Sequence, residues 1–388
     1  MTLKEKAFSY IDQHHEDMLN LWGNMVNIDS GIGVKTGGMD MGNLCAGILE
    51  SLGFSIRRVQ YEKCGDTIIA EQGDMSNPFI LLMGHMDTVF LGGETAKRPF
   101  MIKEGKAFGP GVLDMKGGIV ILLSALQALK AADIHNKVGI KVILDADEET
   151  AHIFSNAPEL IVQEAKGAKC AFNFETGFSD ASLVVQRKGC WRFFVEVFGR
   201  GCHVGNDPEN GRNAILEMAH KIIKIEALTS FQECYNFNVG TITGGTVANA
   251  APDYCKIEVD VRYLQDTELP RLREAVKNIC DHTYVDGTRT VLSDGPTFGV
   301  MKRLPATMEL LEKVKAIAEE NEFAIPKQRI CGGGSDAAYS VAAGVPTLCA
   351  MGVQGARNHT PEEWADVESL FTRSKMLITL LLEFSQGK

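Results

Sequence analysis

Residues 138–150 read VGIKVILDADEET, an apolar run that ends on three consecutive carboxylates, Asp147, Glu148 and Glu149. The apolar run has the length and composition of a buried strand. Carboxylates that lie so close together raise one another's pKa and destabilise a fold unless something offsets their charge. The stretch therefore predicts a core strand, and it raises the question of what holds its acidic end in place.

Strand-like and helix-like segments alternate on both sides of this stretch. Residues 1–28 and 117–132 have the apolar spacing of helices, the first of them amphipathic. Strand-like segments are IRRVQYE (56–62), DTIIAEQG (66–73), PFILLMG (78–84) and AKCAFNFE (168–175). Such alternation predicts an α/β layer with a mostly parallel sheet.

The pattern changes near residue 188. From there the order is strand, helix, strand, strand, helix, strand, over residues 191–199, 211–228, 237–243, 254–263, 268–282 and 288–293. That order is the split arrangement of a ferredoxin-like α+β module. The α/β pattern resumes near residue 300, so we predict a domain formed by 1–187 and 300–388 that is interrupted by a smaller domain at 188–299.

Composition narrows the class of protein. A chain of 388 residues with 45% hydrophobic and 23% charged residues suits a soluble globular protein of two or three domains. Lys and Arg total 39 against 50 Asp and Glu, and no basic block occurs, so nucleic acid is not expected as a partner. The sequence has no uninterrupted apolar run of membrane-spanning length. Ten scattered cysteines indicate reduced thiols in a cytoplasmic protein.

Potential metal ligands follow the ends of the predicted strands, where ligands gather in α/β sheets. Asp114 lies in a glycine-rich turn before a helix, where it could also be an ordinary N-cap. The full set of candidates around the strand ends is His85, Asp87, Asp114, Glu148, Glu149, Glu175 and His359.

Imidazole and carboxylate ligands without thiolates suit zinc, and the same ligands accept Co²⁺ or Mn²⁺. Of these seven candidates, a set of His, Asp, Glu, Glu and His gives five ligands, which are too many for one catalytic zinc site and one too few for two. Two ions would therefore share a bridging carboxylate, which is the arrangement of a two-metal hydrolytic site.

Neighbouring residues in these motifs are expected to have different roles. His85 and Asp87 are two apart on an extended backbone, so Asp87 can accept the second ring N–H of a metal-bound His85. Glu148 and Glu149 are adjacent and cannot point the same way. One can bind metal while the other acts as general base. The alternative is a solvated acidic turn, which fits poorly at the end of a buried strand.

Nine short motifs resemble, in order, those of the co-catalytic zinc aminoacylase and carboxypeptidase family, and in particular its glutamate carboxypeptidase branch. They are GHMDTVF (84–90), GPGVLDMKGG (109–118), the DEE run, FETG (174–177), GRGCHVGNDPENGRNAI (199–215), GGTVANAAPD (244–253), VDVRY (259–263), GGGSDAAY (332–339) and NHTPEEW (358–364). The resemblance implies a zinc-exopeptidase-like α/β domain with an inserted lid and dimerisation domain.

The resemblance also assigns roles. It implies one zinc on His85, Asp114 and Glu175. It implies a second zinc on Asp114, Glu149 and His359. Asp87 would then orient His85, and Glu148 would be the general base.

Residues of the inserted domain would complete the site. In this family the residue at His203 reaches the partner subunit's site and stabilises an oxyanion, assisted by Asn249, while Arg262 grips the substrate carboxylate. Gly333 and Gly334 would line the substrate site. Without the resemblance, His203 is a solvated turn residue, Asn249 a turn former, and Arg262 a solvent-face partner of Asp260.

The expected activity is hydrolysis of an amide bond next to a free carboxylate by a homodimer, releasing a C-terminal amino acid, glutamate first. An N-acyl amino acid deacylase is the alternative. A non-catalytic binding protein is disfavoured because all ligand positions and Glu148 are intact, and acidic charge disfavours a two-metal nuclease. After the DEE run the family usually has small residues such as Gly-Ser, whereas this chain has Ala151 and His152, and Cys202 takes a position that is often Ala. These departures leave the substrate preference open.

Overall fold

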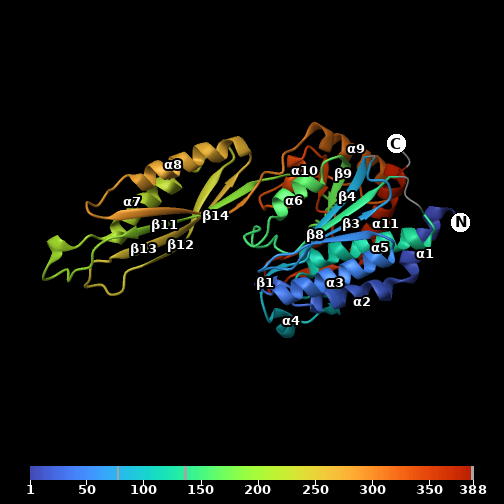
Figure 1. The fold of residues 1–388 in the computed structure, drawn as a ribbon, viewed down its shortest axis with the longest axis horizontal. Coiled ribbons are helices and arrows are strands. Elements are labelled where there is room, and N and C mark those ends of the chain that lie inside the picture. Colours follow the sequence, from blue (N-terminus) through green and yellow to red (C-terminus); the bar gives the residue numbers. More distant parts are fainter. Residues whose placement is uncertain (77, 135–137, 386–388) are drawn as a thin grey trace. The chain divides into compact units, whose positions relative to one another are not determined.

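The computed structural model describes residues 1–76, 78–134 and 138–385, which form two compact units. The first unit comprises residues 1–186, 301–330 and 335–388, and the second comprises residues 187–300 and 331–334 (Figure 1). The candidate metal ligands all belong to the first unit.

The first unit is built on an eight-stranded mixed sheet. Its spatial order is β15 (Gln328–Cys331), β10 (Leu183–Arg187), β16 (Thr347–Cys349), β9 (Ala168–Asn173), β4 (Phe79–His85), β8 (Ile140–Asp145), β3 (Thr67–Gln72) and β2 (Ser55–Val59). The prediction of parallel pairing is confirmed for the central strands β16, β9, β4 and β8. Towards the edges, β10 pairs with β16, β3 with β8 and β2 with β3 in antiparallel fashion. The connection 60–66 between β2 and β3 is too short for the crossover that parallel strands need.

Helices cover both faces of this sheet (Figure 1). One face carries α1 (Leu3–Gln13), α2 (His15–Asn27), α3 (Lys35–Ser51), α5 (Gly117–Ala131) and α11 (Val367–Ser385), which pack on one another, with α9 (Pro305–Glu320) against α11. The other face carries α6 (Ala157–Glu164) and α10 (Ala337–Ala342). The N-terminal segment, predicted as one amphipathic helix, is divided into α1 and α2 at His14.

The core lies between α5 and the central strands. Alternate residues of β4 and β8, among them Leu82 and Val142, join the same buried cluster as Ile119 and Leu122 of α5, as strand alternation requires. Residues 112–131 are long and apolar enough to cross a membrane, yet 94% of their most apolar window is buried inside the unit. This segment is therefore the core helix of the unit together with the turn that leads into it.

Short strands fix the loops around the candidate site. β1 (Gly31–Ile32) pairs with β5 (Thr88–Leu91), and α4 (Glu94–Lys97) follows. A second sheet has the order β17 (Gly355–Ala356), β18 (Trp364–Asp366), β7 (Lys106–Phe108) and β6 (Met101–Lys103). This sheet places the loop between β17 and β18, which contains His359, next to the turn 109–116, which contains Asp114.

The second unit is a four-stranded antiparallel sheet with two helices. Its chain order is β11 (Gly189–Phe198), α7 (Ala214–Glu226), β12 (Asn236–Gly244), β13 (Tyr254–Tyr263), α8 (Leu269–Asp281) and β14 (Arg289–Phe298), with one-turn helices at Pro208–Asn210 and Asp266–Glu268. The spatial order β12-β13-β11-β14 is that of the predicted ferredoxin-like module. Apolar residues on alternate positions of β11 and β13 form its core with Met218 of α7 and Val276 of α8.

Candidate metal centre

The potential ligands converge because their strands are neighbours. Strand β4 ends at His85, β8 leads into the acidic turn 147–150, and Glu175 follows β9 by two residues. These three strands are adjacent and parallel, in the order β9-β4-β8. Their carboxyl ends therefore meet at one edge of the sheet, as the sequence predicted for an α/β layer.

The first ligand group consists of His85, Asp114 and Glu175, whose ligand atoms lie within 4.8 Å of one another. His85 Nε2 is 3.4 Å from Asp114 Oδ1. All three side chains are buried. A buried set of one imidazole and two carboxylates is what a divalent cation such as zinc prefers.

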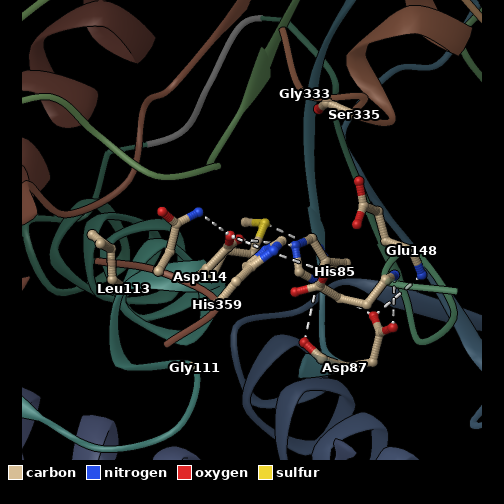
Figure 2. A network of polar contacts seen from close by, with 12 residues as sticks. His85, Asp87, Gly111, Leu113, Asp114, Glu148, Gly333, Ser335 and His359 are labelled. Atoms are coloured by element: carbon tan, nitrogen blue, oxygen red, sulfur yellow. Dashed lines mark hydrogen bonds and ion pairs between the residues drawn. The ribbon is translucent and has the colours of Figure 1, made fainter. Parts of the chain in front are cut away.

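The second group consists of Asp114, Glu149 and His359, within the same limit of 4.8 Å. His359 Nε2 lies 3.2 Å from Asp114 Oδ2 and 3.5 Å from Glu149 Oε2. The other carboxylate oxygen of Glu149 is buried without a hydrogen-bond partner in the described part of the chain. An orphaned buried carboxylate oxygen of this kind fits a site built for a cation. Asp114 is common to both groups, one oxygen facing each imidazole (Figure 2).

Protonation within these groups reflects the crowding of acids. Burial raises the pKa of Glu149 to about 8, and burial also raises that of Glu148 well above its usual range. A hydrogen bond to Asp114 raises the pKa of His359 to about 9. Burial opposes charge on Asp114, but hydrogen bonds from His359 and His85 outweigh it and lower the pKa of this carboxyl. In this arrangement protons offset the negative charge, and a bound cation would release them.

Asp87 connects the imidazole to the acidic turn. Its Oδ1 lies 3.3 Å from His85 Nδ1. The same carboxylate accepts the backbone N–H groups of Glu148 at 3.3 Å and Glu149 at 3.0 Å. Figure 2 shows the Glu148 carboxyl directed away from Asp87. The two glutamates diverge as predicted from their adjacency, because Glu149 faces His359 whereas Glu148 forms no ion pair with it among the described residues.

Asp147 accepts hydrogen bonds from other residues of the acidic turn. Its side chain accepts the backbone N–H of Phe154 at 2.8 Å and the hydroxyl of Thr150. Its carbonyl accepts the N–H of His152 at 2.9 Å. Asp147 therefore caps this turn, which is a common role of Asp in loops.

Glu363 is a residue that sequence reasoning missed. Its Oε1 accepts the N–H groups of Leu113 at 2.8 Å and Asp114 at 3.0 Å, and its Oε2 accepts that of Gly111 at 3.0 Å. The side chain is 1% exposed, and burial raises its pKa to about 7. One carboxylate thus fixes the backbone that presents Asp114. The only sequence signal was the NHTPEEW motif, in which Glu363 follows His359 by four residues.

The other sequence-predicted residues belong to the second unit. His203 and Asn249 are exposed and lie together, because the N–H of Val204 donates to the Asn249 carbonyl at 3.1 Å. Arg262 forms a bidentate pair with Asp260, with Nε to Oδ1 at 2.6 Å and Nη2 to Oδ2 at 3.0 Å. The pairing of Arg262 with Asp260, which the strand pattern suggested without the family resemblance, is therefore present.

Gly333 and Gly334 lie in a tight turn of the same unit. Their carbonyls accept from Arg187 Nη1 at 3.4 and 3.0 Å. A Cβ on Gly334 would fall 2.8 Å from the ring of Phe298. The turn therefore needs glycine at 334 for packing, whatever else it does.

The fold and the paired ligand groups define an α/β enzyme of the metallopeptidase class. Residues 81–383 match the model of peptidase family M20/M25/M40, and the chain belongs to this family. The resemblance inferred from the sequence motifs is thereby confirmed. The coarse activity follows, which is that of a peptidase or amidohydrolase of this family.

Individual relatives span most of the chain or part of it. Carboxypeptidase G2 of Pseudomonas sp. (strain RS-16) is 29% identical over 371 residues, 94% of this chain and 88% of that protein. Acetylornithine deacetylase of Proteus mirabilis (strain HI4320) is 30% identical over 246 residues, 59% of this chain and 62% of that protein. The crystal structure of a tripeptidase from Staphylococcus aureus shares the fold with a TM-score of 0.79 at 18% identity, covering 96% of this chain and 99% of that one.

Proposed function

We propose that this enzyme is a di-zinc hydrolase that cleaves an amide bond next to a free carboxylate and releases a C-terminal amino acid. One observation carries the proposal. Two ligand groups share Asp114. The buried carboxyl of Glu148 lies near them, since the charges of His85, Glu175 and Glu149 affect its pKa. This is the arrangement that two-metal hydrolysis of an amide requires.

In this proposal His85, Asp114 and Glu175 hold one ion, and Asp114, Glu149 and His359 hold the other. When bound, the two ions would supply Lewis acidity to the amide carbonyl and lower the pKa of the attacking water. Zinc fits the ligand set best, and Co²⁺ or Mn²⁺ would also be accepted. Asp87 holds His85 in one tautomer by accepting a hydrogen bond from its Nδ1–H.

Glu148 is the proposed general base. Its carboxylate takes a proton from the attacking water as the water oxygen bonds to the carbonyl carbon. The same carboxyl then delivers that proton to the amide nitrogen as the carbon–nitrogen bond breaks. Burial raises the pKa of Glu148, which suits a group that must both accept and donate a proton near neutral pH.

Arg262 is the proposed anchor for the substrate carboxylate. Among the described residues its Nε and Nη2 bond to Asp260 and its Nη1 to the Gly332 carbonyl at 3.3 Å. An arginine has five N–H donors, so two remain to bind a carboxylate. We propose that Asn249, Gly333 and Gly334 border the same substrate.

We further propose a homodimer in which the second unit serves as lid and dimerisation surface and His203 of one subunit stabilises the oxyanion in the other. The supporting observation is an exposed apolar surface on α7 and the edge strand β12, where Leu216 is 49%, Ile223 69% and Ile242 54% exposed. Sedimentation of the wild type and of an Ile223→Lys variant tests this proposal, with loss of the dimer expected for the variant. All ten cysteines are thiols, which supports a cytoplasmic location.

The alternative is an N-acyl amino acid deacylase, supported by the similarity to acetylornithine deacetylase. The deciding experiment is a hydrolysis screen of the zinc-loaded enzyme on N-acetyl amino acids, dipeptides, and N-blocked peptides that end in glutamate. We expect the highest kcat/KM for substrates with a C-terminal glutamate. A preference for N-acetyl amino acids would support the alternative, and no hydrolysis of any substrate would reject both.

A further inference from the structure

The acidic turn contains two residues in an unusual backbone conformation. Ala151 has φ 57° and His152 has φ 58°, in the left-handed region that residues with a Cβ rarely adopt. Backbone of this kind persists only where the surroundings hold it. The N–H of Ala151 bonds to the Glu148 carbonyl at 2.8 Å. Ala151 and His152 therefore lie in the same turn as Glu148, the candidate base, and Glu149, the candidate ligand.

The side chain of His152 is held by a buried acid. Its Nε2 lies 2.7 Å from Asp336 Oδ1, and the two residues are 7% and 2% exposed. The imidazole also meets the ring of Tyr339 edge-on, with 5.6 Å between centroids. Burial and the charge of Asp336 raise the pKa of Asp145, at the end of β8.

These contacts fasten the far end of the turn. Asp87 holds its beginning through the N–H groups of Glu148 and Glu149. The His152–Asp336 pair holds its end against the residue that precedes α10. Between these two points the chain has only Thr150 and Ala151, so a shift at His152 is passed on directly to both glutamates.

We propose that His152 and Asp336 form a latch that positions Glu148 and Glu149, and that His152 is a positioning residue of this enzyme. His152 belongs to neither ligand group, and its Nε2 is engaged by Asp336. It acts through the turn and not by contact with substrate. The inference goes beyond the proposed function and rests on it for the two zinc sites and, where turnover is measured, for the reaction.

The test compares the zinc-loaded wild type with His152→Leu, Asp336→Leu, the double variant, His152→Gln and the control Ile153→Ala, at an exposed position next to His152. Zinc affinity is measured by competition with a chelator, thermal unfolding in parallel, and kcat and KM on the best substrate of the screen. We expect each leucine variant to bind one of its two zinc ions about 10–100-fold more weakly, as when a partner of a ligand is removed. The kcat should fall by a similar factor with KM changed less than about threefold.

His152→Gln keeps an N–H donor for Asp336 and should retain most of the zinc affinity, whereas Ile153→Ala should leave it unchanged. Replacing both members of a buried pair by apolar residues removes the unpaired group, so the double variant should unfold at a higher temperature than the single ones. Its zinc affinity should nevertheless stay as low as theirs, because the latch is absent in all three.

Two results would overturn the latch. One is a His152→Leu variant that binds zinc as tightly as the wild type. If His152→Leu does not fold, the corresponding result is wild-type zinc affinity in both His152→Gln and Asp336→Leu. The other is a double variant that regains zinc affinity together with thermal stability, since the pair would then have only a structural role. A wild type that binds zinc but hydrolyses nothing in the screen would reject the proposed function, and the zinc affinities would still decide on the latch.

Discussion

The candidate residues of the two units are held in different ways. In the first unit His85, Asp114 and Glu175 are buried at strand ends and converge on one another. In the second unit His203 and Asn249 are exposed on loops. Residues fixed by a rigid scaffold keep their geometry without a ligand, whereas loop residues need a partner to order them. We therefore expect changes in the first unit to affect chemistry and metal, and changes at Arg262 in the second to affect substrate binding.

The largest effect is expected for Glu148→Ala. Loss of a general base lowers kcat by about 10²–10⁴-fold, while the metal content measured by mass spectrometry stays near that of the wild type because Glu148 is in neither ligand group. Glu159→Ala, at an exposed position of α6, is the matched control and should be fully active. A Glu148→Ala enzyme with normal kcat would show that the base has been assigned wrongly.

A smaller loss is expected for Glu363→Gln. Glutamine offers one acceptor oxygen and an NH₂ group, so it cannot accept all three N–H groups of Gly111, Leu113 and Asp114 that the carboxylate now binds. We expect zinc affinity to fall about 10–100-fold, measured by chelator competition. The neighbouring exposed residue provides the control Glu362→Gln. Equal affinities for both variants would contradict the role given to Glu363.

Arg262→Lys probes the other side of the comparison. A lysine cannot keep both bonds to Asp260 and also form a bidentate pair with a carboxylate. A hydrogen bond to a charged group is worth about 1.5–3 kcal/mol, so KM should rise by about tenfold or more with kcat little changed. Steady-state kinetics on the preferred substrate measure this. A fall in kcat at constant KM would mean that Arg262 acts on the transition state and would contradict its role as the anchor for the substrate carboxylate.

Sequence reasoning located the strand ends because the signal is local. The run that ends at Asp145 and the apolar stretch that ends at His85 are strands as predicted, and carboxyl ends of adjacent parallel strands must meet. The antiparallel edge pairs were not predicted, because pairing direction depends on the length of connections and not on strand composition.

Residues that act through contacts with distant parts of the chain could not be identified from the sequence. Glu363 binds amides about 250 positions earlier in the chain, and no local pattern marks an acid for such contacts. His152 was noticed only as a departure from the family pattern, and its partner Asp336 is 184 positions away. Pairings of this kind are set by the tertiary fold, which brings β8 and the start of α10 together.

The smallest effect is a pH dependence of stability in the metal-free enzyme. Burial raises the pKa of Glu149 from 4.5 to about 8, so the folded state keeps a proton that the unfolded chain releases, and stability falls as pH rises through this range. The pKa of His359 is raised from 6.5 to about 9 by its hydrogen bond to Asp114. Its contribution is present below pH 6.5 and is lost as pH rises through 9, which is the same direction.

The lowered pKa of Asp114 adds no slope in this range, because its contribution is complete above the unfolded value of 3.8. Thermal unfolding of chelator-treated enzyme should therefore occur at lower temperature at pH 8.5 than at pH 5.5. Zinc should oppose this trend, since the ligands bind metal in their deprotonated forms, so the stabilisation by zinc should grow with pH. Glu149→Gln should show a shallower decline without metal. A metal-free unfolding temperature that rises from pH 5.5 to 8.5 would mean that the crowded carboxylates of the first unit are not what the cation neutralises.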